Sequence, residues 1–561
     1  MPTRRWDARA SAIAAVAIAV LYGVLGLAVF GPDAVYSGDI GVKFVQTRAL
    51  AASRFTSLDL PYPGEFLDPA REFFPIRPPF VLTVGGETQA IYSPAAVVLQ
   101  TGFAGLAGMR GLIALSFISA AVILFACSRM AVAGQKMAVV IALGLASPLW
   151  FYAVLGWEHA PAVAFSTAGF AVALASRQGW TCVLAGLLVG SGALVREEVI
   201  LLTPGLLLII ALRHRSVYAV AVTCAATIVP VVCGLGMDVL VGRPPAAHLR
   251  HAVYLIPAVN ATETHVVTPF TQRERYQTVI QYWLLGYGND RWIVAFSSAL
   301  FVVLAARWRF PGRAGTIPLL LWVIAVVALA AIDLREVMTA PKWIAGLHRL
   351  SPYLVFVLLP PPTTGERGPW YHRGLLTTAA VYILLAFVGT NFTGGKSLGP
   401  RLLLPLLPLL AVAAMARMVA YLRARAAVDR AIGLAGTVLV MMSIALHVTG
   451  TMPAYYERSR EDTSTLQTAR AADARVIVAD DPFTAQLLFP LYYRKVIFLA
   501  DSSQLRAKLG TLLADAKVPE VLLISRRPEP GMRLSPLKLR QSDRVGRMYI
   551  QYWGRVGRER N

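Results

Sequence analysis

Long apolar runs dominate this chain and limit what it can fold into. The runs are roughly 15–23 residues long, the length that a helix needs to span about 30 Å of hydrocarbon. They must be helical in lipid, because the bilayer core offers the backbone no hydrogen-bond partners. Across 561 residues, 56% are hydrophobic and only 15% are charged, whereas soluble domains carry about 25% charged residues. The sequence predicts an integral membrane protein that crosses the bilayer many times.

The excess of positive charge indicates membrane topology. The chain has 53 Lys and Arg residues against 31 Asp and Glu residues, a formal net charge of +22. These charges sit in short clusters between apolar runs, a pattern typical of the positive-inside rule and not of nucleic-acid binding. All four cysteines, at 127, 182, 224 and 233, fall within apolar runs without a CxxC pair. We therefore expect no disulfide framework, no zinc site and no nucleic-acid partner.

Sorting the basic clusters to one side predicts about thirteen spans, with the N-terminus inside and the C-terminus outside. The run at 94–108 would rise only about 22 Å as a helix, so we expect it to lie at the membrane interface. The first run lacks a clear signal-peptidase site and is predicted to be an uncleaved span. The predicted spans are residues 11–30, 111–127, 138–155, 161–175, 180–195, 199–212, 217–241, 292–306, 317–332, 353–359, 375–390, 402–416 and 431–449.

Two domains are predicted. Residues 1–450 form the transmembrane domain, with long outer loops at 31–100 and 242–291. The tail, 451–561, alternates short β-branched runs (RVIVAD, RKVIFLA, EVLLIS) with helical patterns such as SSQLRAKLGTLLADA. That alternation predicts a small α/β domain with a partly parallel sheet, outside the membrane. No GxGxxG follows a strand there, so no nucleotide-binding fingerprint is expected.

Unusual polar residues collect on the predicted outer face. An active site needs acids and bases as well as cations, whereas the inner face offers mainly Arg and Lys in tight turns. The run at 196–198 joins two short spans without a turn residue, and charges so close to hydrocarbon are usually paired or functional. The candidate site residues are Asp39, Lys43, Glu158, His159, Arg196, Glu197, Lys396 and Arg401.

Most of these candidates also have a simpler interpretation. Asp39 precedes a helical pattern and suits a helix cap. Glu158 and His159 lie at a span boundary, where solvated polar residues are ordinary. Lys396 and Arg401 suit anchoring to lipid headgroups.

Taken together, the set suits the transfer of a group away from a phosphate. A base is needed to deprotonate an acceptor hydroxyl or amine. Fixed cations are needed where a phosphate leaving group gains charge. The glycine-rich segment 391–401 lets backbone approach a phosphate closely, and the interfacial helix at 94–108 could border a groove for a lipid tail.

Five short elements resemble a known family. They are Gly38-Asp39 after the first span, Tyr92-Ser93-Pro94, Trp157-Glu158-His159-Ala160, Arg196-Glu197-Glu198, and the GG-x-S-x-GPR-x-L pattern from Gly394 to Leu402. With them, residues 30 to about 420 resemble the GT-C superfamily of polytopic glycosyltransferases. The similarity is to the bacterial branch that contains protein O-mannosyltransferases and the lipid A aminoarabinose transferase. The last element is the most specific of the five.

The resemblance implies a hexosyl- or pentosyltransferase of the bacterial cytoplasmic (inner) membrane, inverting, with Asp39 as the catalytic base. The donor would be a sugar on polyprenyl phosphate, and the acceptor a glycan, lipid or protein. The phosphate would be held by Arg196, Lys396 and Arg401, and the sugar or acceptor oriented by Glu158 and His159. The chain departs from the family at two positions. Ile40 stands where the family often has a second acidic residue, and Lys43 stands where an aromatic residue is frequent. No metal or other cofactor is expected.

Two other functions fit a chain of this kind. A transporter or flippase for a lipid-linked or anionic solute would place ionisable residues at mid-membrane within broken helices. A scaffold or receptor subunit would use its outer tail to bind a partner.

Overall fold

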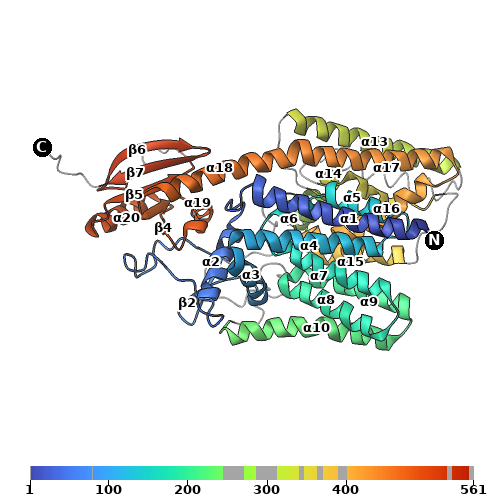
Figure 1. The fold of residues 1–561 in the computed structure, drawn as a ribbon, viewed down its shortest axis with the longest axis horizontal. Helices are drawn as coiled ribbons and strands as arrows, with labels where there is room; N and C mark the ends of the chain where they lie inside the picture. The colour runs from blue at the N-terminus through green and yellow to red at the C-terminus, as the bar shows by residue number, and fades with distance from the viewer. Residues whose placement is uncertain are drawn as a thin grey trace.

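The computed structural model describes residues 2–78, 80–243, 271–285, 313–339, 346–362, 371–389, 398, 401–526 and 534–554. Figure 1 shows a bundle of helices that run along the long axis, with the small sheet at one end of the molecule and the start of α1 at the opposite end. The predicted span at 292–306 and the candidate Lys396 lie outside the described residues, as does most of the predicted outer loop at 242–291.

Apolar helices make up the body of the molecule. Seven helices in the described ranges are long and apolar enough to cross a membrane: Trp6–Val29, Met109–Met130, Val217–Leu240, Thr316–Thr339, Tyr371–Gly389, Arg401–Leu422 and Ala427–Ala471. Shorter apolar helices are α3 (Pro94–Ala107), α5 (Lys136–Leu145), α7 (His159–Ala175) and α8 (Gly179–Val195). These helices support a membrane protein, as the sequence predicts, whereas the number of about thirteen spans stays a prediction.

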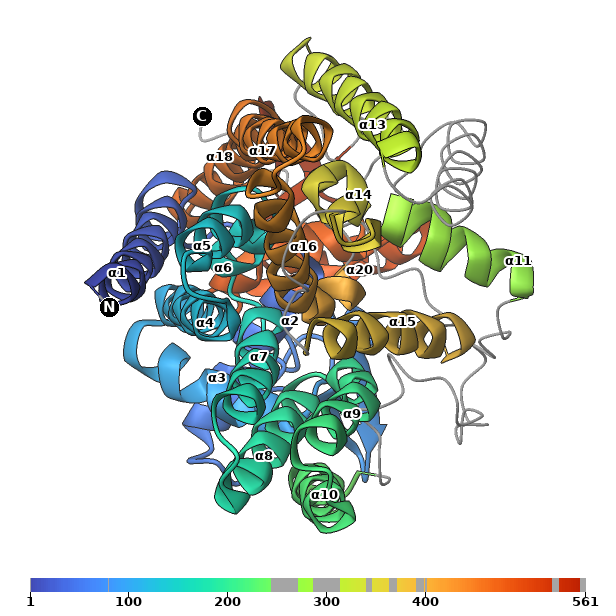
Figure 2. The same ribbon diagram turned by 90° about the vertical axis from the view of Figure 1, so that its right-hand side faces the viewer.

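The remaining elements of the body are α1 (Pro2–Val24), η1 (Leu25–Val29), α2 (Gly38–Ala52), β1 (Val81–Val84), β2 (Glu87–Ala90), α4 (Met109–Met130), α6 (Leu149–Val154), η2 (Glu197–Leu202), α9 (Thr203–His214), α10 (Val217–Leu240), α11 (Gln272–Arg275), η4 (Tyr276–Leu285), α13 (Arg313–Thr339), α14 (Leu347–Leu350), η5 (Pro352–Leu358), α15 (Tyr371–Gly389), η6 (Arg401–Leu406), α16 (Leu407–Leu422) and α17 (Ala427–Leu446). Figure 2 views the bundle along its length and shows α16 near the centre.

Several predicted spans are interrupted. The run at 138–155 forms α5 and α6, separated around Pro148, which has no backbone N–H to continue a helix. The runs at 199–212 and 402–416 each begin as a 3₁₀ turn, η2 and η6, and continue as α9 and α16. The interrupted ends place irregular backbone beside the polar residues described below.

The first outer loop is folded. It begins with α2, continues through the antiparallel hairpin of β1 and β2, and ends at α3. Both α2 and α3 lie across the direction of the long helices, as Figures 1 and 2 show for α3. This orientation agrees with the predicted interfacial position of the run at 94–108.

The tail forms the predicted α/β domain. A continuous helix, made of α17, η7 (His447–Thr451) and α18 (Met452–Ala471), connects it to the bundle. Its five-stranded sheet has the order β4-β3-β5-β7-β6, with β3 parallel to both β4 and β5, and β7 antiparallel to β5 and β6. The elements are β3 (Val476–Ala479), α19 (Pro482–Leu487), η8 (Phe489–Leu491), β4 (Val496–Leu499), α20 (Ser503–Asp515), β5 (Glu520–Ser525), β6 (Lys538–Val545) and β7 (Met548–Gly554).

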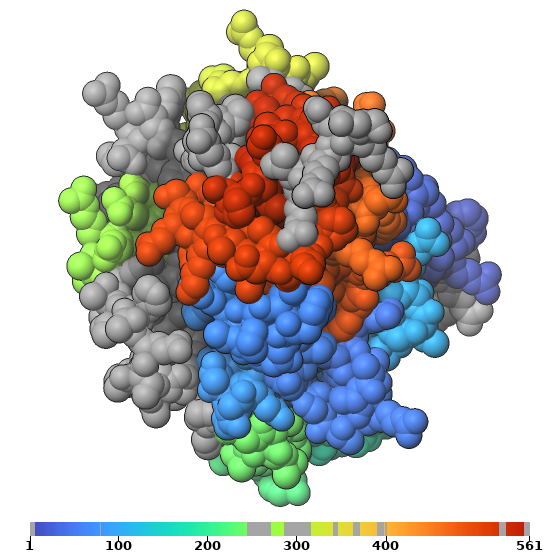
Figure 3. Space-filling model, turned by 90° about the vertical axis from the view of Figure 1, so that its left-hand side faces the viewer, coloured from blue at the N-terminus to red at the C-terminus, as the bar shows by residue number. Residues whose placement is uncertain are grey.

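The tail domain packs directly onto the first outer loop. The two share one apolar core, in which Val42, Leu60 and Phe73 of the loop join Val478 and Phe498 of the sheet. Figure 3 shows this end of the molecule, with the orange tail adjoining the blue loop. Burying this shared surface fixes the position of α2 relative to the sheet.

Candidate functional site

Asp39 lies in the first turn of α2 and bridges two distant parts of the chain. The Tyr92 hydroxyl donates to Asp39 Oδ1 over 3.0 Å, and Arg401 Nη1 lies 3.0 Å from Asp39 Oδ2. The N-cap of the helix is Ser37, so Asp39 is not the capping residue. The Asp39 and Arg401 side chains are 18% and 12% exposed. This carboxylate and this guanidinium are thus joined, yet still accessible from outside.

A second group of charges lies deeper. Lys43 Nζ is 2.5 Å from Glu158 Oε2, and Arg196 Nη1 is 2.8 Å from Glu158 Oε1. The Glu158 side chain is 3% exposed and Lys43 is 1% exposed. Burial of this depth is incompatible with the simpler view of Glu158 as a solvated boundary residue. Its carboxylate instead ties α2 to the end of α8 through two cations.

The 196–198 run is built around Arg196. Arg196 has extended backbone after α8, and its Nε bonds both carboxylate oxygens of Glu198 at 2.9 and 3.1 Å. The candidate Glu197 is buried in the first turn of η2, and its neighbour in the motif, Glu198, pairs with Arg196. Sequence patterns do not distinguish adjacent acids, because the backbone direction decides which way each side chain points.

His159 begins α7 beside the charged group. Its ring contacts Trp157, with centroids 5.0 Å apart, and Tyr152, with centroids 5.5 Å apart. It is buried, and neither ring nitrogen has a hydrogen-bond partner within the described residues. Buried polar atoms normally form hydrogen bonds. The ring nitrogens of His159 could therefore bond a group other than the described residues.

Tyr92 is a site residue that sequence reasoning treated only as part of a motif. Its ring lies under Lys43 Nζ, 4.2 Å from the ring centroid. Burial, together with the Asp39 and Glu158 carboxylates, raises the pKa of Tyr92 well above its usual range, so the phenol stays protonated and donates to Asp39. Arg243 anchors this segment by donating to the backbone carbonyl oxygens of Ala90 and Tyr92 over 2.6 and 2.8 Å.

The assembled site contains the acids, bases and cations that group transfer requires. The structure brings together seven of the eight predicted residues, all except Lys396, which lies outside the described ranges. In the described part of the chain, no group of three or more His, Cys, Asp or Glu side chains could hold a metal ion. The expectation of no metal or cofactor stays a prediction.

Comparison with known proteins gives structural neighbours only. A scan against protein-family models and a search of curated proteins found no match. The crystal structures of ArnT from Cupriavidus metallidurans, in the apo state and bound to undecaprenyl phosphate, align with 13% identity and a TM-score of 0.45 over 96% of this chain and 97% of theirs. AglB, an oligosaccharyltransferase from Archaeoglobus fulgidus, aligns in its complex with an inhibitory peptide and a dolichol-phosphate. That alignment has 12% identity and a TM-score of 0.42, over 92% of this chain and 69% of AglB.

Proposed function

We propose that this protein is an inverting membrane glycosyltransferase that moves a sugar from a polyprenyl phosphate to an acceptor outside the bacterial cytoplasmic membrane. The observation that carries the proposal is the Asp39–Arg401 pair, with 3.0 Å between carboxylate and guanidinium. It joins a proton acceptor to a phosphate-binding cation at a partly open position. Asp39 comes from the first turn of α2, which packs against the tail domain, and Arg401 comes from the start of η6.

In the proposed reaction, Asp39 accepts the proton of the acceptor hydroxyl as the acceptor oxygen attacks the sugar C1. The C1–O bond to phosphate breaks on the opposite face, and the polyprenyl phosphate leaves with the bonding electron pair. Arg401 stabilises the charge that develops on the departing phosphate. Tyr92, held protonated, fixes the second carboxylate oxygen so that Asp39 keeps one orientation.

The deeper charges then act as positioning residues. Because Glu158 binds Lys43 and Arg196 at 2.5 and 2.8 Å, it sets the distance between α2 and the end of α8. Its carboxylate is already engaged by these two cations. His159 is equally buried, but neither of its ring nitrogens has a hydrogen-bond partner among the described residues, so it is the better candidate for a bond to the sugar.

The proposed orientation places the N-terminus in the cytoplasm and the tail domain outside. Asp7 accepts from the backbone of Gly134, and Arg423 donates to the Gly134 carbonyl oxygen. These contacts gather basic turns at the end of the bundle opposite the sheet. The positive-inside rule puts such an end in the cytoplasm.

The transporter alternative receives less support. It needs ionisable residues within broken helices at mid-membrane. Asp39, Glu158, Arg196 and Arg401 instead lie at the ends of α2, α7, α8 and η6, on the side that carries the tail domain.

The test uses purified protein, radiolabelled polyprenyl-phosphate sugars offered one at a time, and a membrane extract as the acceptor source. We expect Asp39→Asn to lower transfer by about 10²–10⁴-fold, the usual contribution of a general base. The matched control is Asp33→Asn, an acid of the same loop whose ion pair with Arg470 is exposed; it should transfer at the wild-type rate. Undiminished transfer by a well-folded Asp39→Asn protein would overturn the assignment.

A further inference from the structure

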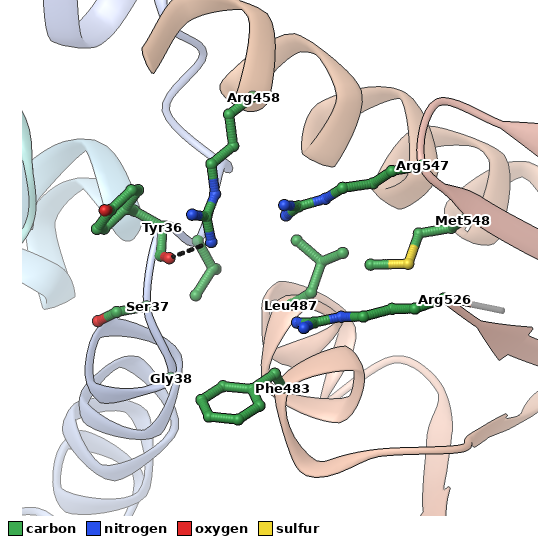
Figure 4. A pocket seen from close by; sticks show the side chains of 10 residues that line it. Tyr36, Ser37, Gly38, Arg458, Phe483, Leu487, Arg526, Arg547 and Met548 are labelled. Carbon is green, nitrogen blue, oxygen red and sulfur yellow. Dashed lines mark hydrogen bonds between the residues drawn. The ribbon is translucent and has the colours of Figure 1, made fainter. Parts of the chain in front are cut away.

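A hollow of about 280 Å³ lies between the start of α2 and the tail domain. Figure 4 shows it from close by. It is lined by Val35, Tyr36, Ser37, Gly38, Arg458, Phe483, Leu487, Arg526, Arg547 and Met548. Part of this volume is open to solvent, so the space next to the lining side chains suits a small group such as an oxyanion.

Three arginines from separate elements converge on this hollow. Arg458 comes from α18, Arg526 follows β5, and Arg547 lies in the turn between β6 and β7. In Figure 4 the guanidinium groups of Arg526 and Arg547 point from the tail domain toward the segment that holds Ser37 and Gly38. Like charges repel, so convergence of this kind needs anions to offset it.

Among the described residues, two aspartates pair with these three arginines. Arg458 and Arg547 share the carboxylate of Asp462, which is 2% exposed. Arg526 Nε is 3.7 Å from Asp481 Oδ2, an ion pair without a close hydrogen bond. None of the described residues that line the hollow is acidic. Arg458 also donates from Nη2 to the Tyr36 carbonyl oxygen over 3.2 Å and stacks on the Tyr36 ring. Arg526 and Arg547 are therefore the guanidinium groups best placed to meet an anion in the hollow.

Residues that line the hollow also carry polar atoms that lack a hydrogen-bond partner among the described residues. The Ser37 hydroxyl and the Nε atoms of Arg458 and Arg547 are buried without a hydrogen-bond partner among the described residues. Ser37 is also the N-cap of the 15-residue helix α2 and makes no side-chain cap bond. The N-terminus of a helix carries partial positive charge and exposed N–H groups, which favour anions.

We propose that this hollow binds an anionic group, a phosphate or a carboxylate, of the substrate that accepts the sugar. That the ligand is the acceptor rests on the proposed function. That it is an anion rests on the three arginines. Arginine pairs with both oxyanions in the same two-pronged geometry.

The position of α2 assigns the group to the acceptor. Ser37 and Gly38 line the hollow, and the next residue, Asp39, pairs with Arg401. Successive residues of a helix point about 100° apart, so the hollow and the Asp39–Arg401 pair occupy adjoining faces of one helical turn. A substrate held in the hollow would present a nearby hydroxyl to Asp39, while the donor phosphate occupies Arg401.

Binding by the full-length protein in detergent tests the charge chemistry without any transfer. The probes are inorganic phosphate, glucuronate and, as the neutral counterpart, glucose, measured by calorimetry. We expect both anions to bind and glucose not to. Arg526→Gln should weaken anion binding about tenfold or more, the usual loss for a charge-assisted hydrogen bond. Arg526→Lys should retain part of the affinity, and Arg494→Gln, an exposed arginine of the same domain, should bind as the wild type does.

A second variant guards against misfolding. Arg458→Gln and Arg547→Gln combined with Asp462→Asn removes both arginines together with the carboxylate that they share. No member of this group is then left unpaired, and anion binding should also weaken. Anion binding equal to wild type in both Arg526→Gln and this triple variant would overturn the proposal, as would no anion binding by the wild type.

Two more measurements separate the acceptor from the donor and from the proposed reaction. Undecaprenyl phosphate binding should fall in Arg401→Gln and persist in Arg526→Gln; the reverse result would assign the hollow to the donor and overturn the proposal. Anion binding should also persist in Asp39→Asn. If transfer proves absent while Arg526-dependent anion binding holds, the proposed function fails and the anion site stands. If transfer holds and binding fails, only the anion site is lost.

Discussion

Glu158 and Asp39, two carboxylates of the same site, differ in how deeply they are buried. Its carboxylate is almost fully enclosed and contacts two cations, whereas the Asp39 carboxylate is only partly covered. Taking charges out of water costs several kcal/mol per ion, which only close pairing offsets. The enclosed group is therefore suited to holding geometry, and the partly open pair to meeting substrate.

Removing one partner of the enclosed group should destabilise the protein. Glu158→Gln leaves Lys43 and Arg196 without a charge that both contact, so we expect a loss of about 3–5 kcal/mol in the free energy of unfolding. Denaturant titration of the detergent-purified protein measures it. Adding Lys43→Met should recover part of the loss, because one buried charge is then removed.

The control is Glu65→Gln, since the ion pair of Glu65 with Arg71 is well exposed. Exposed pairs contribute about 0–1 kcal/mol, so this change should have little effect. A Glu158→Gln protein as stable as the control would contradict the assigned role.

At the scale of elements, α2, the helix of the proposed base Asp39, packs closely against α19. A Cβ on Gly38 would lie 1.6 Å from Gln486 Oε1, and one on Gly41 would lie 2.7 Å from the Gln486 backbone oxygen. Two glycines one turn apart thus let the tail domain press against α2. The helix that carries Asp39 is held by the soluble domain as well as by the membrane helices.

Gly41→Ala should loosen this contact. The backbone oxygen of Gln486 cannot rotate away as a side chain can, so we expect a loss of about 1–3 kcal/mol from overpacking and faster proteolysis of the tail domain. Gly102→Ala on α3 is the matched control, because nothing lies within 4 Å of its added Cβ; it should be neutral or stabilise by about 0.5–1 kcal/mol. Equal proteolysis of the two variants would argue against the contact.

Elements with strong local patterns were predictable from the sequence. The runs VIVA, VIFL and EVLLIS form β3, β4 and β5, because β-branched and aliphatic residues favour buried strands. The strand β6 was missed, since its residues KLRQSDRV are mostly exposed and lack an apolar alternation. It exists because β7 offers it a partner, which no local pattern reveals.

The candidate site divides in the same way. Asp39, Glu158 and Arg401 stand out because charges are rare beside apolar runs. Arg458, Arg526 and Arg547 do not, because the chain has 53 basic residues and these three meet only through the fold of the tail. Spacing along the sequence carries no sign of that convergence.

At the scale of the whole molecule, the start of α1 and the sheet of the tail domain lie at opposite ends (Figure 1). The tail domain covers one end, and turns rich in arginine lie at the other. If the basic end is cytoplasmic, then the Asp39–Arg401 pair and the arginine-lined hollow both open to the outside.

Labelling of single cysteines tests this orientation. In a chain whose own four cysteines are replaced by alanine, Ser542→Cys on the exposed β6 should react with a membrane-impermeant maleimide in intact cells. Arg425→Cys, in the turn between α16 and α17, should react only after the cells are permeabilised. The opposite pattern would reverse the proposed topology.

The continuous helix Ala427–Ala471 has 45 residues. At 1.5 Å per residue it is about 68 Å long, roughly twice the thickness of the hydrocarbon core. If its first half spans the membrane, its second half extends beyond the hydrocarbon core, and Arg458 lies on that second half. Because the helix is continuous, it fixes the distance between the bilayer and the arginine-lined hollow. An acceptor anchored in the membrane would therefore need its anionic group at that distance from the bilayer, whatever the chemical class of the acceptor.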